Sequence, residues 1–157
     1  MSNINLHNVS KEEEALKTAY NDIIAFGKLF LPDDFMRSET PWFHYEIADA
    51  INDNDIKQLA VIMPRGHGKT VLTKADIMRS FCFNQKDFEW GFTDSKPDPF
   101  FYGWVSATAK LATGNMDYVK SHIEMNEKIH YYFGNLRGKK WTEVDIEMAN
   151  GCKLISK

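Results

Sequence analysis

The segment from Leu59 to Ala75, LAVIMPRGHGKTVLTKA, restricts the possible folds of this chain more than any other stretch. An apolar run from Leu59 to Met63 precedes a proline and a glycine-rich basic turn. Buried strands of parallel sheets have such continuous apolar runs. Apolar residues then recur at helical intervals, at Val71, Ala75, Met78 and Cys82. The order of strand, glycine turn and helix predicts an α/β domain.

The glycine turn matches the end of the phosphate-binding pattern G-x-x-x-x-G-K-[ST], with Met63 in place of the first glycine. Gly66 and Gly68 allow the backbone to curl so that its N–H groups point at an anion, and the following helix adds a partial positive charge. In such a loop Lys69 neutralises nucleotide phosphates, and the hydroxyl of Thr70 binds Mg²⁺. The alternative is a glycine-rich turn that carries a surface lysine.

Two other side chains of the turn are candidates for contact with a nucleotide. Arg65 can stabilise the charge that develops on a γ-phosphate, or it can point into solvent or pair with a carboxylate. His67 faces either solvent or the nucleotide. The sequence leaves both alternatives open.

Composition narrows the class of protein. The apolar fraction of 43% predicts a globular fold, and the net charge of −3 argues against a constitutively basic nucleic-acid binder. Cys82 and Cys152 lie far apart in apolar surroundings, which predicts two buried, reduced thiols. No apolar run has the length of a membrane span, and the polar N-terminus lacks the apolar core of a signal peptide. These features predict a soluble cytoplasmic protein.

In the first part of the chain, the pattern predicts two helices before the glycine turn. A capping box at Ser10 and Glu13 opens an amphipathic helix over residues 11–31. Thr40 is the expected N-cap of a second, short helix, which ends near residue 52.

After the glycine turn and its helix, an aromatic-rich surface insertion at residues 84–103 leads into a strand over 101–106. Ser106 or Thr108 caps a long helix over 108–130, and a basic linker covers residues 133–141. Alternating apolar residues on both sides of Asn150-Gly151 predict a β-hairpin.

The octet MPRGHGKT resembles the deviant phosphate loop of the large terminase subunits of tailed bacteriophages. These subunits are ATP-driven motors that package DNA into proheads. Their loop often lacks the first glycine and holds an arginine, as Arg65 does here. The segments FGKLFLPDDF, PWFHYEIADAI, VSATAKLATGNMDYVKSHIEMNEKIHYYFG and KKWTEVDIEMANGCKLIS resemble other parts of that family in the same order. The resemblance covers about residues 23–157.

The resemblance implies an ASCE-type P-loop NTPase fold, with a mostly parallel sheet flanked by helices and an added β-hairpin. It implies an N-terminal helical segment at 1–40 and a partial ATPase domain at 41–157. ATP and Mg²⁺ are the implied cofactors, with Arg65 and Lys69 catalytic and Thr70 on the metal. The implied nucleotide contacts are Phe43, His44, Arg65, Gly66, His67, Gly68, Lys69 and Thr70. In this set Phe43 stacks on adenine and His44 bonds it, although Phe43 also fits a core position of a short helix.

The implied partners are double-stranded viral DNA, a portal protein, a small terminase subunit and further copies of the chain in a ring. The implied location is the cytoplasm of an infected bacterium, not the mature virion and not a membrane.

Two family features are absent from the 157 residues: the acidic motif at the end of a strand, and the nuclease domain. We therefore expect a fragment that binds nucleotide and hydrolyses it poorly. Two other function classes remain open, a helicase-like ATPase and a non-hydrolysing nucleotide-binding module.

Overall fold

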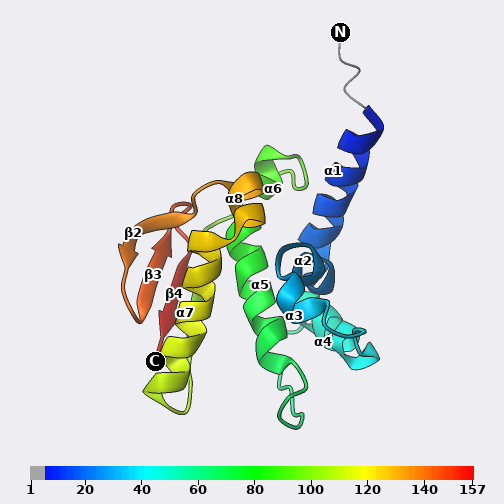
Figure 1. Cartoon of the computed structure of the whole chain (residues 1–157). Helices are drawn as coiled ribbons and strands as arrows, with labels where there is room; N and C mark the ends of the chain where they lie inside the picture. Colours follow the sequence, from blue (N-terminus) through cyan, green and yellow to red (C-terminus); the bar gives the residue numbers. More distant parts are fainter. Residues whose placement is uncertain (1–5) are drawn as a thin grey trace. The chain divides into compact units, whose positions relative to one another are not determined.

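The computed structural model in Figure 1 describes the backbone of residues 6–157 and the side chains of residues 11–157. These residues form a mixed α/β structure, as expected. The chain divides into two compact units, one up to Ala75 and one from Asp76 onward. The elements are α1 (Leu6–Asn21), α2 (Ile23–Phe30), α3 (Pro32–Phe35), α4 (Trp42–Asn52), α5 (Lys69–Phe83), α6 (Lys86–Glu89), β1 (Phe101–Trp104), α7 (Ala109–Met125), α8 (Glu127–Phe133), β2 (Arg137–Trp141), β3 (Asp145–Met148) and β4 (Lys153–Ser156).

The helix expected over 11–31 is two helices, α1 and α2, which separate at Asp22. The backbone of Asp22 is extended, and its carboxylate accepts hydrogen bonds from the N–H groups of Ile24 at 2.7 Å and Ala25 at 3.2 Å. Asp22 is therefore the N-cap of a new helix. Helix α1 already contains residue 10, so the expected start at a Ser10 cap is wrong; the side chain of Ser10 lies outside the described ones.

The short helix expected before the glycine turn is present as α4, but its N-cap is Pro41 and not Thr40. Upstream of it, α2 and α3 approach closely at Gly27, where a Cβ atom would lie 2.5 Å from the ring of Phe35. Phe35 and the connection from α3 to α4 line the site described below.

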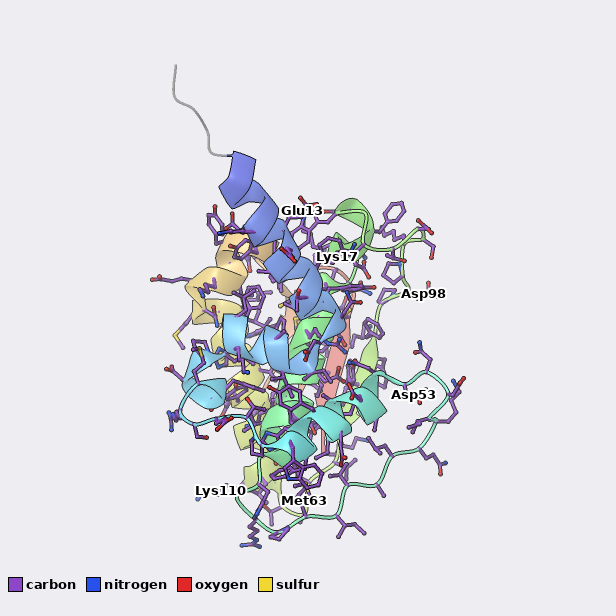
Figure 2. All side chains as sticks on the ribbon, turned by 90° about the vertical axis from the view of Figure 1, so that its right-hand side faces the viewer. Glu13, Lys17, Asp53, Met63, Asp98 and Lys110 are labelled. Atoms are coloured by element: carbon purple, nitrogen blue, oxygen red, sulfur yellow. The ribbon has the colours of Figure 1, made fainter. Side chains whose placement is uncertain are left out.

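The strand expected over residues 59–63 is not formed. Figure 2 shows the chain running as an open loop between Asp53 and Met63, and the side chain of Ile62 is 95% exposed. A strand needs a neighbour that supplies hydrogen bonds, and the described residues up to Ala75 contain no other strand. An apolar run is therefore not sufficient to form a strand.

The sheet belongs to the second unit and has the strand order β1-β4-β3-β2. Only β1 and β4 are parallel, so the expectation of a mostly parallel sheet is wrong and the sheet is mixed. The expected hairpin is confirmed: Ile146 of β3 lies opposite Leu154 of β4, and both are buried. Helix α7 packs beside β4 (Figure 1).

The expected basic linker is strand β2, at the edge of the sheet. Gly138 allows β2 to approach β3 closely, because a Cβ atom there would lie 2.1 Å from the carbonyl oxygen of Glu147. The basic side chains of this region form ion pairs: Arg137 with Glu124, Lys140 with Asp145, and Lys153 with Glu147. Carboxylates therefore neutralise three of the basic side chains of this region.

The helix expected over 108–130 begins as predicted, with the hydroxyl of Thr108 accepting a hydrogen bond from the N–H of Leu111. It divides at Asn126 into α7 and α8. The side-chain oxygen of Asn126 accepts a hydrogen bond from the N–H of Ile129 at 3.1 Å, so it caps α8 as Asp22 caps α2.

Residues of the aromatic-rich insertion pack within the second unit. The ring of Trp90 lies against those of Phe83, Phe92 and Phe133, with centroid distances from 5.5 to 6.0 Å, and the ring of Phe92 lies 6.4 Å from that of Phe83. These rings therefore contribute to the packing of the second unit.

The hairpin turn is bonded to the C-terminal end of α5 through Asn150. The amide nitrogen of Asn150 donates to the carbonyl oxygens of Phe81 at 2.8 Å and Asn84 at 3.3 Å. Carbonyl groups at a helix end lack partners within the helix, so this side chain satisfies them. We expect Asn150→Ala to lower the free energy of unfolding by about 2 kcal/mol.

Chemical denaturation of the 157-residue chain measures this effect. The matched control is Asn135→Ala, because Asn135 makes a single exposed hydrogen bond, to the N–H of Arg137. Equal losses in the two variants would show that the contact between turn and helix contributes nothing.

Tyr102 makes the stability of the second unit sensitive to alkali. Its hydroxyl donates to the hydroxyl oxygen of Ser80 at 2.9 Å, and burial together with the charge of Asp76 raises the pKa of Tyr102 to about 12. The folded state then holds this proton more tightly than the unfolded state, in which the pKa is about 10. The contribution of Tyr102 to the free energy of unfolding is therefore fully present below pH 10 and is lost as the pH rises toward 12.

We expect wild type to lose about 2 kcal/mol more than Tyr102→Phe between pH 9 and pH 12. Unfolding curves across this range measure the difference, and absorbance at the tyrosinate band reports the titration itself. Parallel losses in the two proteins would contradict the assignment.

Both cysteines are buried and free, as the sequence predicts. Burial raises the pKa of the Cys82 thiol well above its ordinary range and also raises the pKa of Cys152, so both thiols are held in their unreactive form. Among the described residues, no helix combines the length and the apolar character needed to cross a lipid bilayer.

Candidate phosphate-binding site

The backbone of the glycine turn has the alternating geometry of an anion-binding loop. Gly66 and Gly68 have φ angles of +81° and +77°, and His67 between them does not have a positive φ. This alternation makes successive N–H groups converge on one point. The first helical hydrogen bond of α5 runs from the N–H of Leu72 to the carbonyl oxygen of Gly68 at 3.0 Å. The amides of the first turn therefore precede the hydrogen-bond ladder of the helix and can bind a ligand.

The side chain of Lys69 folds back over the start of the loop. Its ammonium group donates to the carbonyl oxygens of Met63 at 2.6 Å and Pro64 at 2.8 Å. An ammonium group has three donors, so these two bonds leave one for a ligand. The ammonium group is thus held at the start of the loop before any anion binds.

Two histidines bond to carbonyl oxygens of the loop. Nε2 of His44, in the first turn of α4, lies 2.7 Å from the carbonyl oxygen of His67. Nδ1 of His67 lies 3.0 Å from the carbonyl oxygen of Arg65. The ring of Phe43 contacts the ring of His44 edge-on, with the centroids 4.8 Å apart. Helix α4 and the loop are therefore joined through a ring nitrogen.

A pocket of about 380 Å³ opens beside the loop, entirely within the unit that ends at Ala75. Its walls come from α3, the connection to α4, the start of α4, the loop and the first turns of α5. The lining residues are Asp34, Phe35, Arg37, Ser38, Glu39, Thr40, Pro41, Phe43, His44, Gly66, His67, Gly68, Val71 and Leu72.

The charges around this pocket are of both signs. Arg37, on its wall, and Arg65, in the loop, are exposed, and neither takes part in the ion pairs found among the described residues. Asp34 also lines the pocket, and its charge acts on Lys74 of α5. Burial lowers the pKa of Lys74 and the charge of Asp34 opposes that shift. The two arginines remain available for an anionic ligand.

The structure brings together most of the site residues predicted from the sequence. Phe43 and His44 lie at the same pocket as Gly66, His67 and Gly68, although Gly66 follows His44 by 22 positions in the chain. Arg65, Lys69 and Thr70 belong to the same loop and helix start but do not line the pocket. Sequence reasoning missed the wall formed by residues 37–40, whose only signal is its position just before Phe43.

For a metal ion, no cluster of three or more His, Cys, Asp or Glu side chains occurs among the described residues. Thr70, which is exposed, supplies a hydroxyl in the first turn of α5. Mg²⁺ keeps several waters and binds largely through substrate phosphates, so a single protein hydroxyl suits it when a nucleotide is present.

Comparisons of the chain with models of protein families, with curated proteins and with solved structures gave no match. The functional assignment therefore rests on the residues of the chain itself and on the geometry of this site.

Proposed function

We propose that the chain binds a nucleoside triphosphate, ATP, at the glycine turn. The observation that carries this proposal is a lysine held over a loop with alternating φ angles, at the start of a fifteen-residue helix and beside a pocket. Phosphates would lie on the N–H groups of residues 66–70, within reach of Lys69, and Arg65 would neutralise further charge.

The base would occupy the pocket beside the loop. A volume of about 380 Å³ lies within the range of small-molecule sites, roughly 300 to 1,000 Å³. The ring of Phe43 offers a stacking surface, and Ser38, Glu39 and Thr40, which also line the pocket, offer hydrogen-bonding groups. When bound with the nucleotide, Mg²⁺ would neutralise phosphate charge with the hydroxyl of Thr70 as its protein ligand.

We further propose that this site is the ATP-binding part of a DNA-packaging motor, the large terminase subunit of a tailed bacteriophage. The support is the resemblance of MPRGHGKT and of the segments around it to that family. This proposal includes the P-loop NTPase fold, hydrolysis coupled to movement of viral DNA, assembly with portal protein and small terminase subunit, and action in the cytoplasm of the infected cell. It requires residues 59–63 to join a sheet, whereas in this structure they form no strand and Leu59 and Ile62 are exposed.

Equilibrium binding of MgATP to the 157-residue chain tests the first proposal. A fluorescent ATP analogue is titrated with the chain and then displaced by ATP, ADP, AMP or inorganic triphosphate. We expect ATP and ADP to displace it at similar concentrations, inorganic triphosphate to displace it more weakly, and AMP to be the weakest. No binding at millimolar nucleotide would refute the proposal.

A non-hydrolysing nucleotide-binding module is the second candidate. Hydrolysis needs a side chain that orients the attacking water. Asp34 and Glu39 are the acidic residues of the pocket wall, and both are exposed. A phosphate-release assay separates the candidates: turnover stimulated by double-stranded DNA supports the motor, and binding without turnover supports the module.

A further inference from the structure

We propose that His44 and His67 act together as positioning residues that hold the phosphate loop open for an anion. This inference rests on the proposed function and adds to it a pair of side chains that prepare the loop without touching phosphate. One ring nitrogen of each histidine lies at hydrogen-bond distance from a loop carbonyl. Nε2 of His44 is 2.7 Å from the carbonyl oxygen of His67, and Nδ1 of His67 is 3.0 Å from that of Arg65.

The two carbonyls determine the direction of two N–H groups. In a planar trans peptide, the C=O of one residue and the N–H of the next point in opposite directions. The bond from His44 to the carbonyl of His67 therefore turns the N–H of Gly68 away from His44. The bond from His67 to the carbonyl of Arg65 turns the N–H of Gly66 away from the ring of His67 in the same manner.

Gly66 and Gly68, which follow these two carbonyls, need a restraint from outside the loop. Both have positive φ, and glycine has the largest backbone freedom of any residue. The loop is also exposed at Arg65, Gly66 and His67, so surrounding packing does not restrict it. A ring held in the first turn of α4 supplies that restraint, because the N–H of His44 itself donates to the carbonyl of Pro41 at 3.0 Å.

The arrangement also determines two tautomers. A carbonyl oxygen only accepts, so the ring nitrogen that faces it must carry the proton. His44 must therefore be protonated at Nε2, and His67 must be protonated at Nδ1. Nitrogen chemical shifts of the two imidazoles distinguish these forms, and the measurement needs no nucleotide.

Substitution tests the pair with matched variants. The amide nitrogen of glutamine takes the place of Nε2, and that of asparagine takes the place of Nδ1. We expect His44→Phe, which keeps an aromatic ring and loses the donor, to weaken MgATP binding by about tenfold. We expect His44→Gln to recover most of the affinity and His44→Asn to recover little. At the other position the order reverses, with His67→Asn better than His67→Gln.

The nucleotide-free chain gives an independent measurement. The backbone order parameter of Gly68, from nitrogen relaxation, should be lower in His44→Phe than in wild type and in His44→Gln, because the restraint on the His67 carbonyl is lost. If the chain binds no nucleotide, the proposed function fails, while the tautomers and this order parameter still decide whether the histidines restrain the loop. An Nε2-protonated, Nδ1-free His67, or an unchanged order parameter in folded His44→Phe, would overturn the inference. If His44→Phe does not fold, the tautomers of wild type and the order of the Gln and Asn variants decide it.

Discussion

Replacing Lys69 with alanine should weaken binding of MgATP by about 100-fold or more. Hydrogen bonds between charged partners contribute about 1.5 to 3 kcal/mol each, and a lysine at this place in a loop contacts more than one phosphate oxygen. A loss of about 2.7 kcal/mol corresponds to 100-fold in the dissociation constant. The folded chain should change little, because Lys69 bonds only two carbonyl oxygens of an open loop.

Isothermal titration of wild type, Lys69→Ala and Lys69→Arg measures this effect. Arginine keeps the charge but replaces a compact ammonium with a planar fork, so we expect only partial recovery. Lys110→Ala is the control for net charge, since Lys110 is an exposed lysine of α7 in the other unit. Equal affinity of Lys69→Ala and Lys110→Ala would show that the loop is a glycine-rich turn with a surface lysine.

The two glycines of the loop should respond unequally to alanine, with Gly68→Ala the more damaging. Both have positive φ, which costs a residue with a Cβ atom about 1 to 2 kcal/mol. At Gly66 the added atom meets nothing within 4 Å. At Gly68 it would lie 2.7 Å from Cε1 and Nε2 of His44. The ring must then move, and its bond to the carbonyl of His67 is lost.

We therefore expect a loss of affinity for MgATP of about tenfold for Gly66→Ala and about 100-fold for Gly68→Ala. The same substitutions in a His44→Ala background separate the two causes, which are the backbone strain of a positive φ and the steric clash with the ring of His44. There the additional loss from Gly68→Ala should shrink to that of Gly66→Ala, because the ring that the new atom meets is gone. Equal losses in the original background would contradict the contact between His44 and Gly68.

The fold could be predicted wherever the cause is local. The turn at Asn150-Gly151 and the cap at Thr108 depend on side chains and backbone angles within a few residues, and both are present. The breaks at Asp22 and Asn126 are local as well, but the apolar periodicity continues through them and conceals the caps. Both residues have side chains that favour the N-cap position. A search of each long periodic stretch for Asp or Asn as a possible N-cap would have included both.

The strands could not be predicted in the same way. Residues 59–63 have the composition of a buried strand and pair with nothing in this structure, whereas Arg137–Trp141 are basic, contain a glycine and pair with β3. In a strand the hydrogen-bond partners come from elsewhere in the chain, so composition alone does not decide pairing.

At the candidate site, the loop could be predicted from the sequence: its glycines, its lysine and threonine, and the helix that follows act over neighbouring residues. The sequence could not show that α4 brings His44 to the carbonyl of His67, or that residues 34, 35 and 37–41 line a pocket with Gly66 and Gly68. The two cases differ in the range of the interactions. Backbone angles and caps act along the chain, whereas a pocket and a side-chain clamp depend on how α3 and α4 pack, which no single segment specifies.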